Sequence, residues 1–237
     1  MSNSYFQFKQ FRIDQSGCAM KVTTDASLFG AWITIQSHPA AHALDIGGGT
    51  GLLSLMFAQK NEAKIDVIEI EQTCFDQMKK NIESSKWSNR IQCILKDVRD
   101  YTSTHQYSII FSNPPFHQGQ LRSDDVSINL ARHGDELTLE LLFKKIKELL
   151  SEDGVFYLLG PAYRDEETIF TASNNGMYVK TKVFVKQSIH HKPFRIMYAF
   201  SRTEHSDVVS DEIIIKDEKD QYTGKFIELL KDYYLYL

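Results

Sequence analysis

The glycine-rich stretch at residues 42–59, HALDIGGGTGLLSLMFAQ, constrains the fold of this chain more than any other feature. Apolar residues at Ala43, Leu44 and Ile46 predict a short buried strand, and the apolar positions after Gly51 predict an amphipathic helix. The closely spaced glycines between them allow a tight turn with unusual φ angles and let a ligand approach the backbone. A helix that begins just behind such a turn favours a negatively charged group. The stretch therefore predicts a strand–turn–helix unit that binds a ligand.

An acidic residue follows this turn at the place where nucleoside-binding folds use one. Glu69 lies near the carboxyl end of the next predicted strand, 65–70, where its carboxylate can accept hydrogen bonds from both hydroxyls of a ribose. A dinucleotide site would need G-x-G-x-x-G, but its third glycine position is Leu52 or Ser54 in the two possible registers. The remaining pattern, D-x-G-x-G-x-G with a downstream Glu, indicates an S-adenosylmethionine site. The cofactor contacts expected from this pattern are Asp45, Gly47, Gly49, Gly51 and Glu69.

Asp97 and Val98 follow a third predicted strand at 91–95. From that place the Asp97 carboxylate can accept a hydrogen bond from the adenine amine of the cofactor, so we expect both residues to line the adenine end of the site. Simpler alternatives stay open for the two acids. Asp97 can be an ordinary loop residue, and Glu69 can be a solvated acid at a strand end.

The segment 107–116, YSIIFSNPPF, places a rigid polar turn at the end of another strand. Its two prolines restrict φ and remove two backbone donors. The side-chain oxygen of Asn113 and the carbonyl of Pro114 then offer two acceptors to one planar NH2 group, and the ring of Phe116 can stack on its heterocycle. This arrangement suits methyl transfer to an amine with a delocalised lone pair, so these three residues are the expected catalytic residues, with Asn113 also beside the cofactor. The alternative is a proline-rich strand exit capped by Asn.

The order of the predicted elements indicates an α/β fold. Strands are expected at 42–46, 65–70, 91–95, 107–112, 154–159, 178–186 and 195–201, and helices at 50–60, 72–84, 137–151 and 163–175. The last two strands have no helix between them, so they are expected to pair as an antiparallel hairpin. A mainly parallel, seven-stranded sheet that ends in such a hairpin is the Rossmann-like architecture of class I methyltransferases. Its ligand lies over the carboxyl ends of the first strands.

The charge of the chain argues against indiscriminate coating of nucleic acid. The 237 residues suit one domain, 1–237, and carry a formal net charge of −4. Basic residues nevertheless gather late in the chain, while acids gather at 207–220, which predicts a basic face for RNA. Its expected members are Lys186, Lys192 and Arg195. The alternative is a pair of solvated strands.

The three cysteines, Cys18, Cys74 and Cys93, have no C-x-x-C spacing. They are expected to be reduced, in a cytoplasmic protein without a disulfide or a zinc site. Adjacent residues in a strand or loop diverge, so the pair at His190 and His191 is not expected to bind metal. No metal is therefore expected. No apolar run suggests a signal peptide or a membrane span, so no membrane is expected either.

Three segments lie outside the predicted core. Residues 1–40 are expected to be an extension packed on the cofactor site. The polar segment 117–134 is expected to be a substrate lid in which Arg132 reaches phosphate. At the end of the chain, apolar residues recur at helical spacing through 222–237, which predicts a terminal helix docked on the sheet.

Taken together, several stretches resemble one family, the bacterial tRNA-1(Val) (adenine-37-N6)-methyltransferases. They are FQFKQFRIDQSGCAMKVTTDASLFGAW at 6–32, DIGGGTGLL, VIEIE, SNPPF and YTGKFIELLKDYYL. The resemblance implies S-adenosylmethionine-dependent methylation of the N6 amine of adenine 37 in tRNA(Val). It also implies that Lys21, Thr24 and Asp25 lie over the methionine end of the cofactor, whereas the residues alone fit a capped helix with Asp25 in its first turn. Phe116 stands where the family commonly has Tyr.

Other readings of the two motifs stay open. A protein-glutamine methyltransferase, an rRNA guanine-N2 methyltransferase or a DNA adenine methyltransferase would use the same cofactor and the same NPPF chemistry. A non-catalytic RNA-binding module is a further alternative. No N-terminal helical domain like that of release-factor glutamine methyltransferases is expected from residues 1–40, and the flanking stretches favour tRNA. A monomer is expected.

Overall fold

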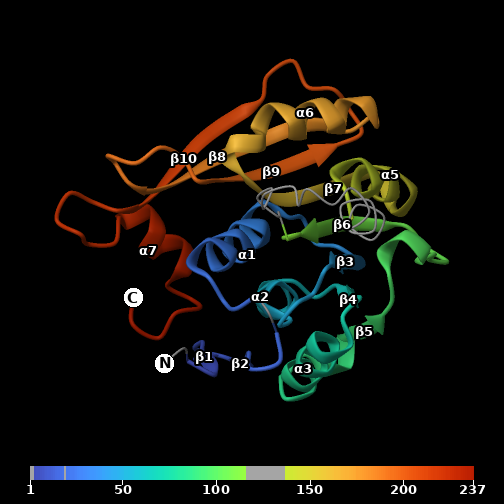
Figure 1. Cartoon of the computed structure of the whole chain (residues 1–237), viewed down its shortest axis with the longest axis horizontal. Helices are drawn as coiled ribbons and strands as arrows, with labels where there is room; N and C mark the ends of the chain where they lie inside the picture. The colour runs from blue at the N-terminus through green and yellow to red at the C-terminus, as the bar shows by residue number, and fades with distance from the viewer. Residues whose placement is uncertain (1–2, 19, 116–136) are drawn as a thin grey trace, which may run out of the picture.

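One sheet runs through the computed structural model, which describes residues 3–18, 20–115 and 137–237 (Figure 1). Within these ranges the sheet has eight strands in the order β10-β8-β9-β7-β6-β3-β4-β5. Their bounds are β3 His42–Ile46, β4 Lys64–Glu69, β5 Ile91–Leu95, β6 Tyr107–Ser112, β7 Leu150–Pro161, β8 Tyr178–Ser188, β9 Arg195–Ser201 and β10 Val209–Lys216. Neighbouring strands from β5 to β7 are parallel, and β9 is antiparallel to both β7 and β8.

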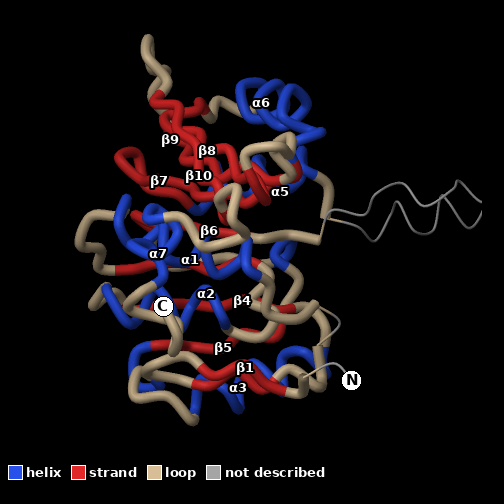
Figure 2. The backbone as a smooth tube through the Cα atoms, turned by 90° about the vertical axis from the view of Figure 1, so that its left-hand side faces the viewer, coloured by secondary structure: helices blue, strands red, loops and turns tan. Residues whose placement is uncertain are grey.

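The predicted Rossmann-like architecture is confirmed, with one strand more than the seven expected. The predicted hairpin is β8 with β9, and the extra strand β10 pairs in parallel with β8 at the sheet edge. In the side view, the strands follow one another from β5 through β4, β6 and β7 toward β8 and β9 (Figure 2). The sequence does not reveal β10 because the first half of this strand is mostly polar and exposed, and within the strand only Ile213 and Ile215 are buried. An edge strand that is buried over half its length gives a weak periodic pattern.

Helices cover both faces of the sheet (Figure 1). One face packs against α1 (Thr24–Gln36), α2 (Leu52–Lys60), α3 (Gln72–Glu83) and α7 (Gly224–Leu230), and the other against α5 (Leu139–Leu149) and α6 (Asp165–Asn174). Alternation along the strands feeds both cores, since Ala43 belongs to the first and Leu44 to the second. Short elements complete the fold: a hairpin of β1 (Tyr5–Gln7) with β2 (Arg12–Asp14), and the 3-10 helices η1 (Ser88–Arg90), η2 (Val98–Asp100) and η3 (Ala162–Arg164).

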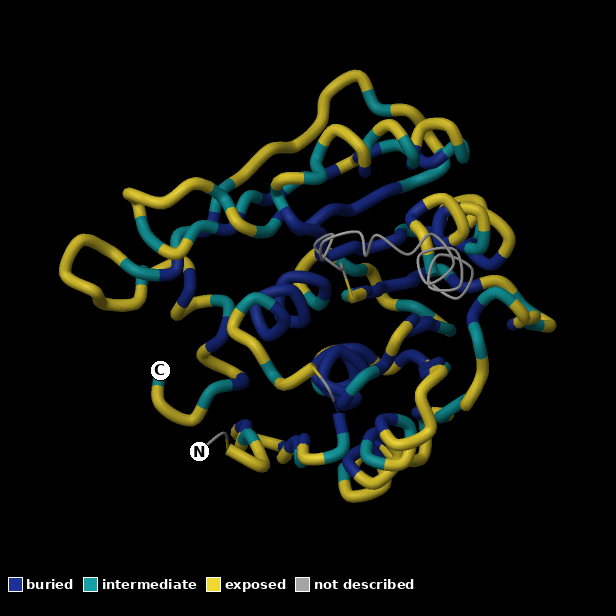
Figure 3. Tube along the Cα trace, in the orientation of Figure 1, coloured by how far each residue is buried: buried dark blue, intermediate teal, exposed yellow. Residues whose placement is uncertain are grey.

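Helix α2 differs from the amphipathic helix that its sequence predicts. Seven consecutive residues, 52–58, are buried, which is visible as the dark helix at the centre of Figure 3. The outer face is covered by α1 and by the end of the chain, where the Tyr233 hydroxyl donates to the Met56 carbonyl at 3.3 Å. The second layer therefore comes from segments far away in the sequence, and a helix that is covered on all sides is apolar all round.

The C-terminal segment is only partly helical. Of the predicted helix at 222–237, α7 forms Gly224–Leu230, and the chain then turns. The apolar side chains beyond it still pack inward, because Tyr233 is buried and Tyr234 forms a bridge with Phe8 of the N-terminal segment. Their spacing fits a helix, but their burial results from contact with α1, α2 and the N-terminal segment.

Candidate active site

The glycine turn lies at the carboxyl end of β3, where it is tied to β4. The backbone N–H groups of Gly47 and Gly48 both donate to the Ile68 carbonyl at 2.9 Å, and Gly51 donates back to Gly48 at 2.8 Å. Gly47 has a φ of 75°, and a Cβ placed there would meet no atom within 4 Å. The backbone at Gly47 is therefore open to a ligand, in a conformation that suits glycine.

Glu69 holds this turn through backbone hydrogen bonds. Its side chain is buried at 8% exposure. One carboxylate oxygen accepts from Gly49 N at 2.9 Å, and the other accepts from Ile70 N at 2.9 Å and Glu71 N at 3.0 Å. A carboxylate has about four acceptor positions, so these bonds leave about one for a ribose hydroxyl. The predicted contact with both ribose hydroxyls stays a prediction, while the bond to Gly49 is a structural role that the sequence does not suggest.

Asp45 is a fully buried carboxylate beneath the turn. Its Oδ2 accepts from the Ser54 hydroxyl at 2.7 Å, while its Oδ1 is buried without a hydrogen-bond partner. Burial raises the pKa of Asp45 to about 7, against the lowering effect of Ser54, and the charge of Glu69 adds to the rise. A buried acceptor without a partner is costly, so it suits a ligand that donates hydrogen bonds. S-adenosylmethionine has an ammonium group and ribose hydroxyls, whose donors match the acceptors of Asp45 and Glu69.

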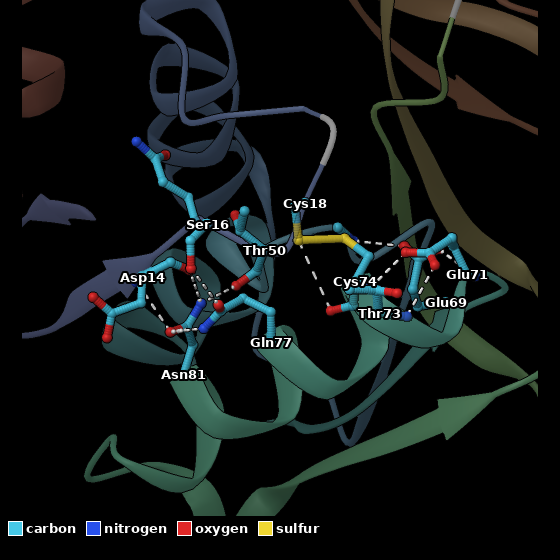
Figure 4. Close-up of a disulfide and its surroundings, with 12 residues drawn as sticks. Asp14, Ser16, Cys18, Thr50, Glu69, Glu71, Thr73, Cys74, Gln77 and Asn81 are labelled. Carbon is cyan, nitrogen blue, oxygen red and sulfur yellow. Dashed lines mark hydrogen bonds between the residues drawn. A yellow bond between two sulfur atoms is a disulfide. The ribbon is translucent and has the colours of Figure 1, made fainter. Parts of the chain in front are cut away.

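A disulfide fastens the N-terminal segment beside this turn (Figure 4). Cys18 is bonded to Cys74 in the first turn of α3, with 4.7 Å between their Cα atoms. The prediction of three reduced cysteines is therefore wrong for this pair, and only Cys93 is free. The two residues are 56 positions apart in the sequence, and packing of residues 14–18 against α3 brings them together. The local spacing of cysteines in the sequence cannot predict such a contact.

Asn81 connects the same segment to the glycine turn. Its side-chain amide donates to the carbonyls of Asp14 at 2.8 Å and Thr50 at 2.9 Å, and its oxygen accepts from Asp14 N at 3.0 Å (Figure 4). A few residues on, the Gln15 side-chain oxygen accepts from Val22 N at 2.9 Å and closes the loop between them. Residues 14–18 and 20–22 are therefore anchored next to the turn. The sequence does not reveal this role of Asn81, because a polar residue in the last turn of a helix carries no signal of such a partner.

The residues that the resemblance places over the cofactor lie at the start of α1. Lys21 is exposed, and Thr24 is the first residue of the helix after the N-cap Thr23. Asp25 lies in the first turn, as the simpler alternative expects, and one of its oxygens accepts from Arg195 Nε at 2.8 Å. Their contact with the methionine end stays a prediction.

Asp97 and Val98 follow β5, close to Glu69, since Lys96 N donates to the Glu69 carbonyl at 3.0 Å. The Asp97 carboxylate accepts from Arg99 N and Arg99 Nε, both at 2.8 Å, and these bonds keep the pKa of Asp97 below its ordinary value. Val98 is buried in η2. Asp97 is therefore a charged residue that caps η2, and its bond to an adenine amine stays a prediction.

The NPPF turn lies directly beside the glycine turn. Ile46 and Ser112 are register partners at the ends of β3 and β6, and the Ser112 hydroxyl donates to the Ile46 carbonyl at 2.7 Å. Asn113 is half-buried and Pro114 is buried. The predicted stacking residue Phe116, the segment 117–134 and its Arg132 lie outside the described residues. Two motifs about sixty positions apart thus meet at one edge of the sheet, which is the arrangement that their strand ends predict.

The predicted basic face is partly neutralised. Lys186 pairs with Glu212 at 2.6 Å, and Arg195 pairs with Asp25. Lys192 is exposed in the turn between β8 and β9. The expected separation of bases from the acids at 207–220 is wrong for Lys186, because the additional strand β10 brings Glu212 beside it.

The structure offers neither a metal site nor a membrane-spanning helix within the residues it describes. Among residues 3–18, 20–115 and 137–237, no cluster of at least three His, Cys, Asp or Glu side chains could hold a metal ion. No helix in the described part of the chain combines the length and the apolar character that crossing a membrane requires.

Comparisons of the sequence and of the fold with known proteins both find methyltransferases. The family model "Methyltransferase small domain" matches residues 29–159. Proteins named tRNA1(Val) (adenine(37)-N6)-methyltransferase are similar over the full length: one from Dyadobacter fermentans is 40% identical, covering 98% of both chains, and one from Phocaeicola vulgatus is 36% identical, covering 99% of both. The fold is similar to that of a predicted O-methyltransferase from Agrobacterium tumefaciens, with a TM-score of 0.68, 14% identity, and coverage of 88% of this chain and 96% of the other.

Proposed function

This chain belongs to the tRNA1(Val) (adenine(37)-N6)-methyltransferase family, and we infer that it transfers a methyl group from S-adenosylmethionine to the N6 amine of adenine 37 in tRNA(Val). The observation that supports this function best is the pairing of β3 with β6, which puts the NPPF turn beside the glycine turn. A site for the methyl donor and a site for an amine acceptor are then neighbours on one sheet edge.

We propose that the cofactor is held by acceptors on the ends of β3 and β4. Asp45 and Glu69 take hydrogen bonds from its ammonium and ribose, and Gly47 and Gly49 let it approach the backbone, with Gly51 at the start of α2. Asp97 and Val98 lie toward the adenine, and Lys21, Thr24 and Asp25 toward the methionine. When bound, S-adenosylmethionine supplies an electrophilic methyl group.

The acceptor amine is oriented by the NPPF turn. The side-chain oxygen of Asn113 and the carbonyl of Pro114 each accept one N–H of the adenine amine, which localises the lone pair on nitrogen. Stacking on Phe116 holds the ring, after the nucleotide has turned out of its loop. Catalysis then rests on positioning and on fixed dipoles. No strong base is needed, since the methylated amine is acidic and releases its proton to Asn113 or to water.

The wider assignment follows from the substrate. A tRNA-modifying enzyme works where tRNA is used, so we propose a cytoplasmic location, and we propose that the chain acts as a monomeric single domain. Residues 1–40 would cover the cofactor, residues 117–134 would close on the RNA, and residues 222–237 would dock on the sheet. Arg132, Lys186, Lys192 and Arg195 are the proposed RNA contacts from the sequence.

The test is transfer of a labelled methyl group to unmodified tRNA, followed by mass spectrometry of the nucleosides. We expect N6-methyladenosine at position 37. Asn113→Ala should lower turnover by about 10²–10³-fold or more, because one preorganised polar group at the reacting centre is lost. Asn113→Asp keeps an acceptor and should retain partial activity.

Cofactor binding to Asn113→Ala, measured by calorimetry, is the control and should stay near that of the wild type. Wild-type turnover by Asn113→Ala would reduce the NPPF turn to a strand exit. Methylated guanine or glutamine in place of N6-methyladenosine would select one of the alternative methyltransferases.

A further inference from the structure

Two exposed aromatic residues lie at the same end of the sheet as the NPPF turn, where the parallel strands have their carboxyl ends. Tyr163 lies in η3, just after β7, and its side chain is 61% exposed. Phe194 precedes β9 and is 37% exposed. Large aromatic side chains at the surface are unusual enough to need an explanation when they lie together beside a site.

The backbone holds the two residues next to each other. The Ala162 N–H donates to the Phe194 carbonyl at 3.2 Å, and Phe194 N donates to the Val185 carbonyl at 3.0 Å. Pro161 and Arg195 are register partners in the β7–β9 ladder, so Tyr163 and Phe194 each lie one or two residues beyond that pair. Two adjacent chain segments therefore present the rings from a fixed backbone, so little conformational freedom is lost when a partner binds.

The position relative to the NPPF turn follows from the sheet. In the β6–β7 ladder Ser112 pairs with Leu158, so β7 continues past the end of β6 by three residues, to Pro161. With about 3.3 Å per residue along a strand and about 4.8 Å between strands, the aromatic pair lies roughly 10–15 Å from Asn113. A base that is held at Asn113 would have its sequence neighbours near this pair.

The turn that leads to Phe194 is basic. The turn 187–194 contains His190, His191 and Lys192 and no acid. Lys192 is exposed and forms no ion pair with any residue that the structure describes. Acids lie nearby as well. Asp25 is paired with Arg195, Asp165 with Lys182 and Glu167 with Arg164, while Glu166 in the first turn of α6 is exposed. Aromatic rings beside free positive charge are the usual platform for single-stranded nucleic acid.

We propose that Tyr163 and Phe194 stack on the nucleotides that flank the target adenine, while Lys192 contacts their phosphates. This proposal rests on the function inferred above, and it makes the two rings specificity-determining residues for an unpaired RNA loop. The rings bind the flanking bases and take no part in the chemistry, since they lie away from the reacting amine.

The experiment uses the full chain and a tRNA anticodon stem-loop that contains the target adenine. Tyr163→Ala and Phe194→Ala should each raise the KM for this RNA by about tenfold or more, with kcat at saturating RNA and the Kd for S-adenosylmethionine unchanged. Tyr163→Phe and Phe194→Trp should restore the KM, because both keep a stacking ring. The matched control is Phe170→Ala on α6, which removes a 67% exposed ring elsewhere and should change nothing.

Two readouts separate stacking from a loss of structure. With 2-aminopurine beside the target adenine, binding to the wild type should quench fluorescence, and Tyr163→Ala or Phe194→Ala should remove most of the quench. The slope of log affinity against log salt should stay the same in both variants, since no phosphate contact is lost, whereas Lys192→Ala should reduce it by about one.

The proposal is overturned if the wild type methylates the RNA and the two ring variants keep its KM and its quench. It is also overturned if the wild type is a dimer and these variants turn it into a monomer, because the rings would then bind a second copy of the chain. Failure of the wild type to methylate any tRNA would instead refute the proposed function.

Discussion

The two halves of the functional edge differ in how far the protein completes them. On the cofactor side, around the ends of β3 and β4, the glycine turn is fixed by backbone hydrogen bonds, by the buried Glu69 and by the Asn81 bridge. On the acceptor side, around the ends of β6 and β7, Asn113 is half-buried and Tyr163 is exposed. A small cofactor can be enclosed by the protein, whereas a large RNA needs a binding surface that is open to solvent.

The difference extends to charge. The cofactor side buries carboxylates, and Asp45 keeps one oxygen without a partner. The acceptor side carries basic side chains. Two of those expected to contact RNA, Lys186 and Arg195, are already paired with acidic residues of the same chain. Burial makes single groups on the cofactor side energetically important, while screening by water makes single charges on the acceptor side weak. The effects of substitutions on the two sides should therefore differ in size.

The largest effect should come from Asp45 and should depend on pH. Burial raises its pKa to about 7 from 3.8, so the folded protein binds this proton more tightly than the unfolded chain. The contribution to stability is fully present below about pH 4 and is lost as the pH rises through about 7. The unfolding free energy of the cofactor-free wild type, relative to Asp45→Asn, should fall by roughly 4 kcal/mol across this window.

Urea denaturation of both proteins between pH 4 and pH 8 measures this difference. The exposed Asp153→Asn is the control and should give a constant difference. A constant difference for Asp45→Asn as well would mean that Asp45 is charged in the folded protein at every pH tested.

The disulfide should be the next largest contribution. Cys18→Ser with Cys74→Ser should lower the unfolding free energy by about 2–4 kcal/mol, because the bond closes a long loop in the unfolded chain. A reductant should have a similar effect on the wild type and none on the double variant. Cys93→Ser is the control that keeps the bond. Three free thiols in the native protein, counted with a thiol reagent, would contradict the disulfide.

Glu69→Ala should weaken S-adenosylmethionine binding by about 1.5–3 kcal/mol, since a buried charged acceptor and its bond to Gly49 are lost. Calorimetry gives the affinity, with the exposed Glu218→Ala as control. Affinity for tRNA should not change. An unaltered affinity for S-adenosylmethionine would mean that Glu69 does not bind it. Tight binding of NAD would mean that the site takes a different cofactor.

The smallest effects should come from substitution of single basic residues on the acceptor side. Lys192→Ala should weaken tRNA binding by about 0.5–1 kcal/mol and lower the salt slope by about one. Lys186→Ala and Arg195→Ala should lower the slope less, because both side chains are held by acids. Binding measured at several salt concentrations compares the three. Equal slopes for all three variants and the wild type would make these bases ordinary solvated residues.

Strand ends were the most predictable part of this protein. The bounds of β3, β5, β6 and β9 match the sequence-based expectation, and so does the pairing of β8 with β9. Each of these strands is mainly apolar and is followed by glycine, proline or polar residues, and this pattern is local in the sequence. Since the carboxyl ends of parallel strands meet at one edge, the meeting of DIGGGTG with NPPF also followed from the sequence.

Tertiary structure alone decided the features that join distant segments. The Cys18–Cys74 bond, the Asn81 bridge to Thr50, and the pairing of β10 with β8 each depend on a partner that is not a sequence neighbour. Residue type shows which bonds a side chain can form, but only packing shows which partner comes within reach. For the same reason, Arg195 is a basic residue in the sequence and the ion-pair partner of Asp25 in the folded protein.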